Sequence, residues 1–119
     1  MSYDNPINAT YRFPAAAVDT DAAIGQIVGP AGKTGRLKAV SSVNTTEVTV
    51  AAAVINIGNA DNDARYGVHG IPLGVAGVDQ NGFTRGATDL IPADSSVVVS
   101  STGAPTAGDA DIIVHIDWF

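Results

Sequence analysis

The chain ends in Asp111-Ile112-Ile113-Val114-His115-Ile116-Asp117-Trp118-Phe119, where apolar side chains recur at every second position. Alternate side chains of a strand point to opposite faces of its sheet. Ile112, Val114, Ile116 and Trp118 therefore share one face, which we predict to be the core face. A frayed terminus would expose the only tryptophan of the chain, so we expect this last strand to be docked.

The composition extends this β character to the whole chain. The 119 residues include 14 Val and 10 Ile but only 3 Leu, 2 Lys and 1 Glu. Val and Ile pack well on pleated sheets, whereas Leu, Lys and Glu are the residues that normally fill helices. With 45% hydrophobic residues the chain can bury a core, and its length is that of one domain.

Short apolar segments separated by turn residues predict the strands. They are residues 11–13, 25–28, 36–43, 47–57, 83–85, 97–99 and 111–119. This pattern is typical of an all-β, single-domain β-sandwich or jelly-roll-like fold with seven to nine short strands. Residues 1–9 are polar and contain Asn5-Pro6, so we predict an extended N-terminal arm before a β domain at 10–119.

Several local features are predicted from spacing alone. In the third segment Leu37, Ala39, Ser41 and Val43 share one face by the period of two. Residues 47–57 form the longest strand candidate. For residues 19–21 a helix cap and an Asx turn both remain open.

Two further features concern turns and loops. The strongest hairpin signal is Gln80-Asn81-Gly82, because Asn-Gly accepts the positive φ angles of a tight turn, with residues 83–85 as the returning strand. His69 lies among glycines in a segment, 66–78, that we expect to be an irregular strand or a loop.

The polar residues form no catalytic constellation that we recognise. His115 and Asp117 share a strand face, but a hydrolytic triad also needs an activated serine, and no Gly-x-Ser-x-Gly elbow is present. Asp61 and Asp63, or Asp109 and Asp111, could hold Ca²⁺ or Mg²⁺, although aspartates in turns more often serve local hydrogen bonding. We predict no catalytic residue, no cofactor and no metal.

The charge balance restricts the partners. Twelve acidic and six basic side chains give a formal net charge of −6. Nucleic-acid binders need clustered Lys and Arg to replace counterions, so we expect no nucleic-acid partner. The sequence has no 18-residue apolar stretch and no signal-peptide pattern, so we also expect no membrane partner.

A small, acidic, cysteine-free and Leu-poor β domain of this kind resembles the capsid decoration, or cement, proteins of tailed bacteriophages. The resemblance rests on the segment from Ile27 to Leu37, with its loop Gly29-Pro30-Ala31-Gly32-Lys33-Thr34-Gly35, and on the ending from Gly108 to Phe119. It implies a non-enzymatic β-sandwich that binds the outside of the capsid and reinforces contacts between subunits of the major capsid protein. It also implies synthesis in the host cytoplasm and a final location on the virion surface. Members of this family differ in oligomeric state, and we expect this chain to self-associate as a homo-oligomer.

Partner binding would then involve the arm and scattered basic side chains. We expect residues 2–10 to order on a neighbouring subunit, as extended segments do when they add to a sheet or fill a groove. The residues predicted to contact a partner are Tyr3, Asn5, Pro6, Arg12, Arg36, Lys38, Arg65 and Arg85. The alternatives are a head-fibre or tail-fibre β module, which would form stable trimers, and a small carbohydrate-binding module with exposed aromatic residues.

Overall fold

The structure is a computed structural model that describes residues 7–119. This part of the chain contains no helix, and therefore none long and apolar enough to cross a membrane. Its ten strands are β1 (Ile7–Ala17), β2 (Ala22–Val28), β3 (Gly35–Asn44), β4 (Ala53–Gly58), β5 (Gly67–Ile71), β6 (Asp79–Asn81), β7 (Thr84–Arg85), β8 (Leu90–Ile91), β9 (Ser96–Thr102) and β10 (Asp109–Trp118). The count exceeds the predicted seven to nine because two of them, β7 and β8, have only two residues.

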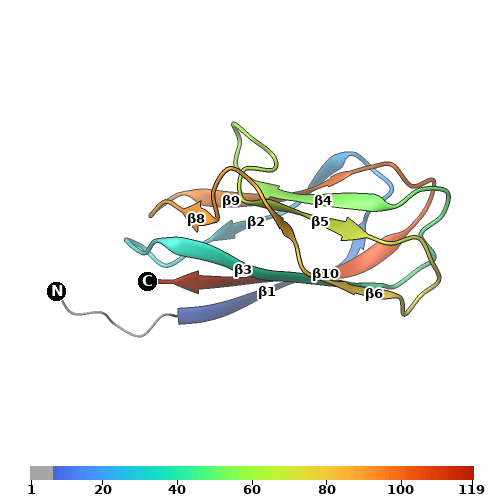
Figure 1. Cartoon of the computed structure of the whole chain (residues 1–119), viewed down its shortest axis with the longest axis horizontal. Coiled ribbons are helices and arrows are strands. Elements are labelled where there is room, and N and C mark those ends of the chain that lie inside the picture. The colour runs from blue at the N-terminus through green and yellow to red at the C-terminus, as the bar shows by residue number, and fades with distance from the viewer. Residues whose placement is uncertain (1–6) are drawn as a thin grey trace.

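The strands form two antiparallel sheets that pack face to face (Figure 1). The first sheet has the order β1-β10-β3-β6, with β8 also paired to β3, and the second has the order β2-β9-β4-β5-β7. The pairs β1–β10, β2–β9, β3–β6 and β4–β5 are those of one long hairpin rolled into a barrel-like sandwich. This is the topology of a jelly roll, so the predicted all-β sandwich is confirmed.

The core lies between the sheets and confirms the alternation in β10. Ile112, Val114 and Ile116 are completely buried, and Trp118 is 1% exposed. The Trp118 Nε1–H donates a hydrogen bond to the Tyr11 hydroxyl at 2.9 Å. The chain end is docked as predicted, because the backbone N–H and C=O of the last residue, Phe119, both hydrogen-bond to Thr34.

The first strand begins earlier than the predicted domain boundary. Residues 7–9 pair with residues 116–118 of β10, so these three positions belong to the first sheet rather than to the arm. The segment 19–21 between β1 and β2 forms a bend that no helix follows, so the helix-cap alternative is wrong.

The predicted face of β3 is wrong beyond Leu37. His115 pairs with Ala39 and Ile116 pairs with Leu37, so Lys38 is an extra residue that forms a β-bulge. The bulge reverses the alternation: Val40 is buried, whereas Val43 is 41% exposed. Ala39 and Ser41 are likewise only partly buried.

The predicted strand over 47–57 is also wrong in its first half. Val50 has a φ of 76°, which an extended strand does not permit, and β4 begins only at Ala53. Before this break, Val48 and Thr49 make isolated bridges to Gly74 and Ala107. The first half therefore belongs to a loop that is bound to two other loops.

The predicted hairpin at Asn81-Gly82 does not form. Gly82 has the expected positive φ, 101°, but β6 pairs with β3 and β7 pairs with β5. The turn therefore carries the chain from the first sheet to the second. Its position is set by tertiary contacts: the Gly82 N–H donates to the Val40 carbonyl, and Phe83 packs partly buried against the core.

Candidate interaction surfaces

Three of the predicted partner-binding residues are paired with aspartates of their own chain. Arg12 lies 2.7 Å from Asp111, as measured between Nη2 and Oδ2. The other two pairs are Lys38–Asp117 at 3.1 Å and Arg36–Asp89 at 3.9 Å. Such exposed pairs contribute only about 0–1 kcal/mol each. They nevertheless reduce the positive charge that these residues offer to a partner.

Asp111 has the clearest electrostatic environment of these carboxylates. The hydrogen bond from Arg12 is the largest influence and lowers the pKa of Asp111, and a second bond from the Ala15 N–H acts in the same direction. Ala15 has a φ of 47° and lies in an irregular segment of β1 opposite Asp111. Asp111 therefore holds this irregularity in place.

Three basic residues, Arg36, Arg65 and Arg85, lie near one end of the sandwich. Arg36 is opposite Leu90 in the β3–β8 pair, and the Thr88 N–H donates to the Arg65 carbonyl. Arg85, in β7, is opposite Gly67 and exposed. Tyr3, Asn5 and Pro6 lie outside the described residues.

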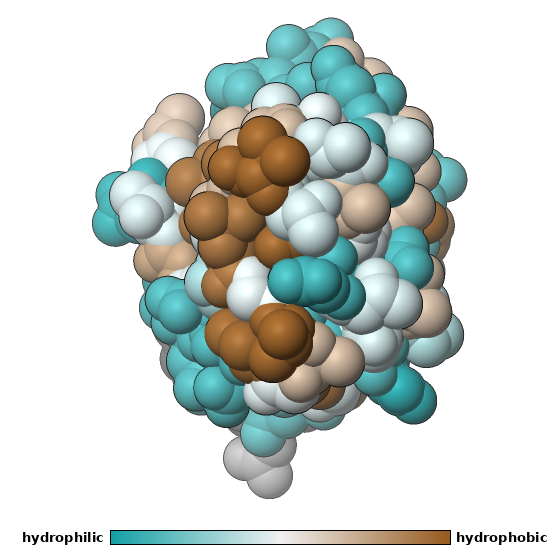
Figure 2. Space-filling view, turned by 90° about the vertical axis from the view of Figure 1, so that its right-hand side faces the viewer, coloured by the Kyte–Doolittle hydropathy of each residue, from teal (hydrophilic) through white to brown (hydrophobic). Residues whose placement is uncertain are grey.

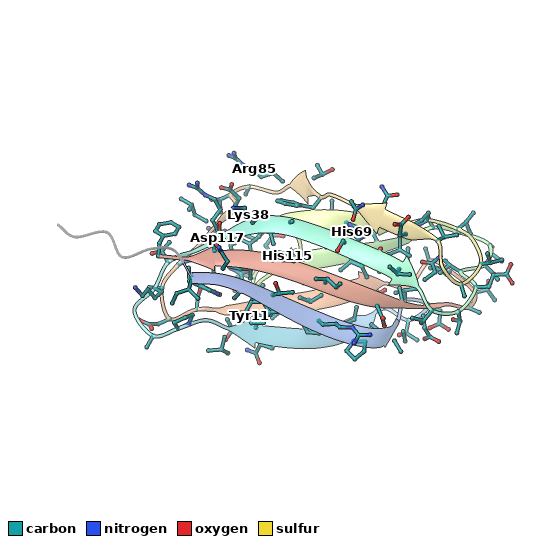
Figure 3. The ribbon with its side chains drawn as sticks, turned by 90° about the horizontal axis from the view of Figure 1, so that it is seen from below. Tyr11, Lys38, His69, Arg85, His115 and Asp117 are labelled. Carbon is teal, nitrogen blue, oxygen red and sulfur yellow. The ribbon has the colours of Figure 1, made fainter. Side chains whose placement is uncertain are left out.

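A shallow, open depression of 340 Å³ lies on the outer face of the first sheet, beside His115, Lys38 and Asp117 (Figure 3). The Thr10 hydroxyl lies 3.1 Å from His115 Nδ1, and Lys38 is paired with Asp117. Its walls are Asn8, Ala9, Thr10, Lys38, Ala39, His115 and Asp117. His115 and Asp117 share a face as predicted, but in this structure each bonds to a residue of a neighbouring strand.

The second histidine, His69, lies in the core and not in a loop. It belongs to β5 and is 1% exposed, because its side chain points toward the first sheet. Its Nε2 lies 2.8 Å from the Ser42 hydroxyl, and its Nδ1 lies 2.6 Å from the Gly82 carbonyl. The spacing matches a serine–histidine dyad, but Ser42 is also 1% exposed, so its hydroxyl is closed to a substrate. The pair joins the two sheets.

The end of the sandwich toward which β3 and β5 run is made of four connecting segments, and backbone hydrogen bonds tie them together. They are residues 18–21, 45–52, 72–78 and 103–108. Val18 donates to Gly108, Val48 and Gly74 exchange two bonds, and Thr49 donates to Ala107. We call this surface the loop end. It is a hydrogen-bonded platform rather than a set of independent loops.

Asn44 fixes one of these segments, residues 72–78. Its backbone bonds to Gly77 and Val78, and its side-chain Nδ2 donates to the carbonyls of Pro72 and Gly74 at 3.2 and 3.3 Å. Asn44 is 2% exposed, so these bonds are shielded from competing water. The segment 72–78 is therefore held at several points.

The loop end presents a cluster of exposed apolar side chains. Val50 is 79% exposed, Val75 61% and Leu73 50%. The bridge between Val48 and Gly74 places their two loops side by side. Figure 2 shows the hydrophobic surface at this end of the molecule. A single exposed apolar side chain is ordinary, whereas a cluster of this kind is typical of an interaction site.

Val50 is held in a strained conformation. The Ala51 N–H donates to the Thr49 carbonyl at 2.9 Å across Val50, whose φ is 76°. These are the features of a γ-turn of the rare type, and a β-branched residue is seldom found in this region. Such conformations cost on the order of 1–3 kcal/mol and persist only where the surroundings enforce them.

Within residues 7–119, acidic residues lie at this end of the sandwich and basic residues do not. The loop end and the strand residues next to it carry five carboxylates and, among the described residues, no Lys or Arg. The five are Asp19, Asp21, Glu47, Asp79 and Asp109. All the basic side chains lie at positions 12, 33, 36, 38, 65 and 85, outside the segments that form the loop end.

The sequence analysis missed the loop end, although a signal was present. Leu73 and Val75 are large apolar residues in a glycine-rich segment that shows no strand alternation. Apolar side chains in a segment without a buried face are exposed by default. Only the fold shows that the loop of Val50 lies beside theirs.

Asp109 and Asp111, two of the candidate cation ligands, have other partners: Asp109 accepts a hydrogen bond from Thr46, and Asp111 accepts one from Arg12. The turn that contains Asp61 is held by the Asn59 side chain, which accepts from backbone N–H groups. Within residues 7–119 no three His, Asp or Glu side chains are grouped closely enough to hold a metal ion.

No model of a known protein family matches the chain, and no curated protein sequence matches it significantly.

Proposed function

We propose that this protein is a non-enzymatic structural protein that decorates the outside of a tailed-bacteriophage capsid. In this role it would stabilise contacts between subunits of the major capsid protein. The observation that carries the proposal is the exposed apolar cluster of Val50, Leu73 and Val75 on a rigid platform. An exposed apolar surface of this kind is typical of proteins whose task is to bind another protein.

The physical requirements of decoration are modest and agree with this architecture. A decorating protein must bury surface across shell subunits, because that binding free energy has to be lost before the shell opens. It needs a stiff body and an adhesive surface, and no active site. The rolled jelly roll supplies the stiffness. The fold alone would suit many functions, so the surface carries the argument.

The arm and the basic residues remain part of this proposal. Residues before Ile7 would add to a neighbouring subunit, while Arg65 and Arg85, which have no ion-pair partner among the described residues, would face carboxylates of a neighbouring copy of this chain. Copies of the protein would associate as a homo-oligomer on the capsid surface. The protein would be made in the host cytoplasm and end in the virion.

Co-sedimentation with undecorated shells tests the proposal. The shells are assembled from the major capsid protein of the virus that encodes this chain, mixed with the purified protein and heated. We expect saturable binding and a higher disruption temperature of the shells. Absence of binding at micromolar concentration would overturn the proposal, and a stable trimer in solution would then favour the fibre module.

A further inference from the structure

We propose that the loop end is the surface that docks on the partner. Its partner site would have an apolar centre bordered by Lys and Arg. The inference rests on the proposed function, since the partner is taken to be the capsid shell. It differs from the sequence-based expectation, which assigned binding to the arm and the basic residues.

The rigidity of the platform is the first argument. Binding that has to order a loop loses part of its free energy to that ordering. Here Asn44 clamps residues 72–78, and the bridges Val48–Gly74 and Thr49–Ala107 join three segments. The apolar side chains are therefore presented in a fixed arrangement, which favours tight binding.

The strain at Val50 is the second argument. A valine at a φ of 76° has an unfavourable backbone conformation, and with 79% of its surface exposed its side chain gains little of the stabilisation that burial supplies. An interface that buries Val50 would supply this stabilisation, so the residue is suited to be an apolar anchor in a partner pocket.

Charge identifies the kind of partner. The five carboxylates at the loop end are not balanced by any Lys or Arg in the same segments. Two loop ends facing each other would bring ten acidic groups together, and like charges that face each other across an interface repel. A second copy in that orientation is therefore disfavoured. A site with Lys and Arg around an apolar centre is complementary to this surface.

The experiment compares variants in the shell-binding assay. The test variant carries Val50→Asn, Leu73→Ser and Val75→Ser; asparagine is chosen at position 50 because it tolerates positive φ. The matched control is Val28→Ser, since Val28 is 71% exposed at the opposite end of the sandwich. We expect the Kd of the test variant to rise about tenfold or more, the size expected for loss of one anchor residue. The control should bind like the wild type.

A second pair of variants tests the charge argument. Glu47→Gln with Asp79→Asn should weaken binding several-fold and reduce its sensitivity to salt. The control combines Asp61→Asn with Asp63→Asn, at the end of the sandwich opposite the loop end. It should leave both the affinity for shells and its sensitivity to salt unchanged. Circular dichroism and thermal melts verify that every variant is folded.

The outcomes separate the two proposals. If the wild type binds shells and the triple variant binds them equally well, the loop-end inference is overturned and the decoration role remains intact. Absence of binding by the wild type would overturn both. If sedimentation velocity shows a dimer that dissociates on the triple substitution, a second copy covers the loop end, and the inference about the partner is wrong.

Discussion

The His69 imidazole and the Ser42 hydroxyl meet 2.8 Å apart inside the sandwich, although they belong to different sheets. The Gly82 carbonyl can only accept a hydrogen bond, so Nδ1 of His69 carries the proton and donates to it. Nε2 then accepts from the Ser42 hydroxyl. One buried histidine in a single tautomer thus links β3, β5 and the crossing turn after β6.

This arrangement makes the stability of the protein depend on pH. Burial lowers the pKa of His69 below its ordinary value of about 6.5, and the bond to Gly82 offsets only part of this effect. Below about pH 6.5 the unfolded chain binds a proton that the folded chain does not, so unfolding becomes more favourable. We expect the free energy of unfolding to be highest above about pH 6.5 and to fall as the pH falls toward the lowered pKa.

Urea unfolding at several pH values between about 5 and 8 measures this dependence. His69→Gln should flatten the profile in that range, while His115→Gln controls for loss of a histidine from the partly exposed outer face. If His69→Gln does not fold, the ring nitrogen shifts of the wild type report the same property. A cationic His69 in the folded protein at pH 6.5 would contradict the expectation.

The sequence predicted those parts of the fold that depend on one strand alone. The alternation around Trp118 was enough to identify the core face of β10, because that strand is regular along its buried face. The face of β3 was not predictable, since the bulge at Lys38 exists only in the pairing with β10. The turn at Asn81-Gly82 has the expected positive φ, yet tertiary pairing decides that it joins two sheets.

The candidate surfaces likewise depend on contacts between segments that are distant in the sequence. Arg12, Arg36 and Lys38 could be selected by residue type, but their aspartate partners come from other strands and loops. The loop end is assembled from four segments that are far apart in sequence. No local pattern could therefore place the loop of Val50 beside that of Leu73 and Val75.

The Arg12–Asp111 pair provides a second expectation. Arg12→Gln removes the largest influence on the pKa of Asp111, so this pKa should rise toward its ordinary value but not reach it, because the Ala15 N–H still donates. A carboxyl group whose pKa is lowered in the folded protein stabilises the fold at pH values above its ordinary pKa. This contribution is lost as the pH falls through the lowered pKa. The variant should thus lose a small part of its stability at neutral pH and less at low pH.

Carboxyl ¹³C shifts of Asp111, followed by NMR during an acid titration, measure this change directly. Lys38→Gln is the matched control, since it removes a comparable surface pair at Asp117. An unchanged titration of Asp111 in Arg12→Gln would mean that the Ala15 N–H alone sets its pKa.

Asn44 should be important for the stability of the loop end. Asn44→Ala removes two hydrogen bonds to partly buried carbonyls, which together contribute about 1–3 kcal/mol. Asn56→Ala is the control, because the Asn56 side chain bonds only to the exposed Thr102 hydroxyl. We expect urea unfolding to show the loss for Asn44→Ala alone. Hydrogen exchange should also become faster at the amides of Gly74 and Gly77. Unchanged exchange would mean that the backbone hydrogen bonds alone are sufficient to hold residues 72–78.

The packing of Trp118 explains why glycine is needed at position 35. A Cβ built on Gly35 would lie 2.6 Å from Cζ3 of Trp118, and this ring cannot move aside because its Nε1 is bonded to Tyr11. Gly35→Ala should therefore destabilise the protein by about 1–3 kcal/mol, the usual cost of overpacking a core.

Gly70→Ala is the matched control, since nothing lies within 4 Å of a Cβ there. Trp118 is the only tryptophan, so its fluorescence should report a displaced ring in Gly35→Ala and an unchanged one in Gly70→Ala. Equal stability of the two variants would show that the ring can shift without loss, and the fit of Trp118 between the sheets would then not be what requires glycine.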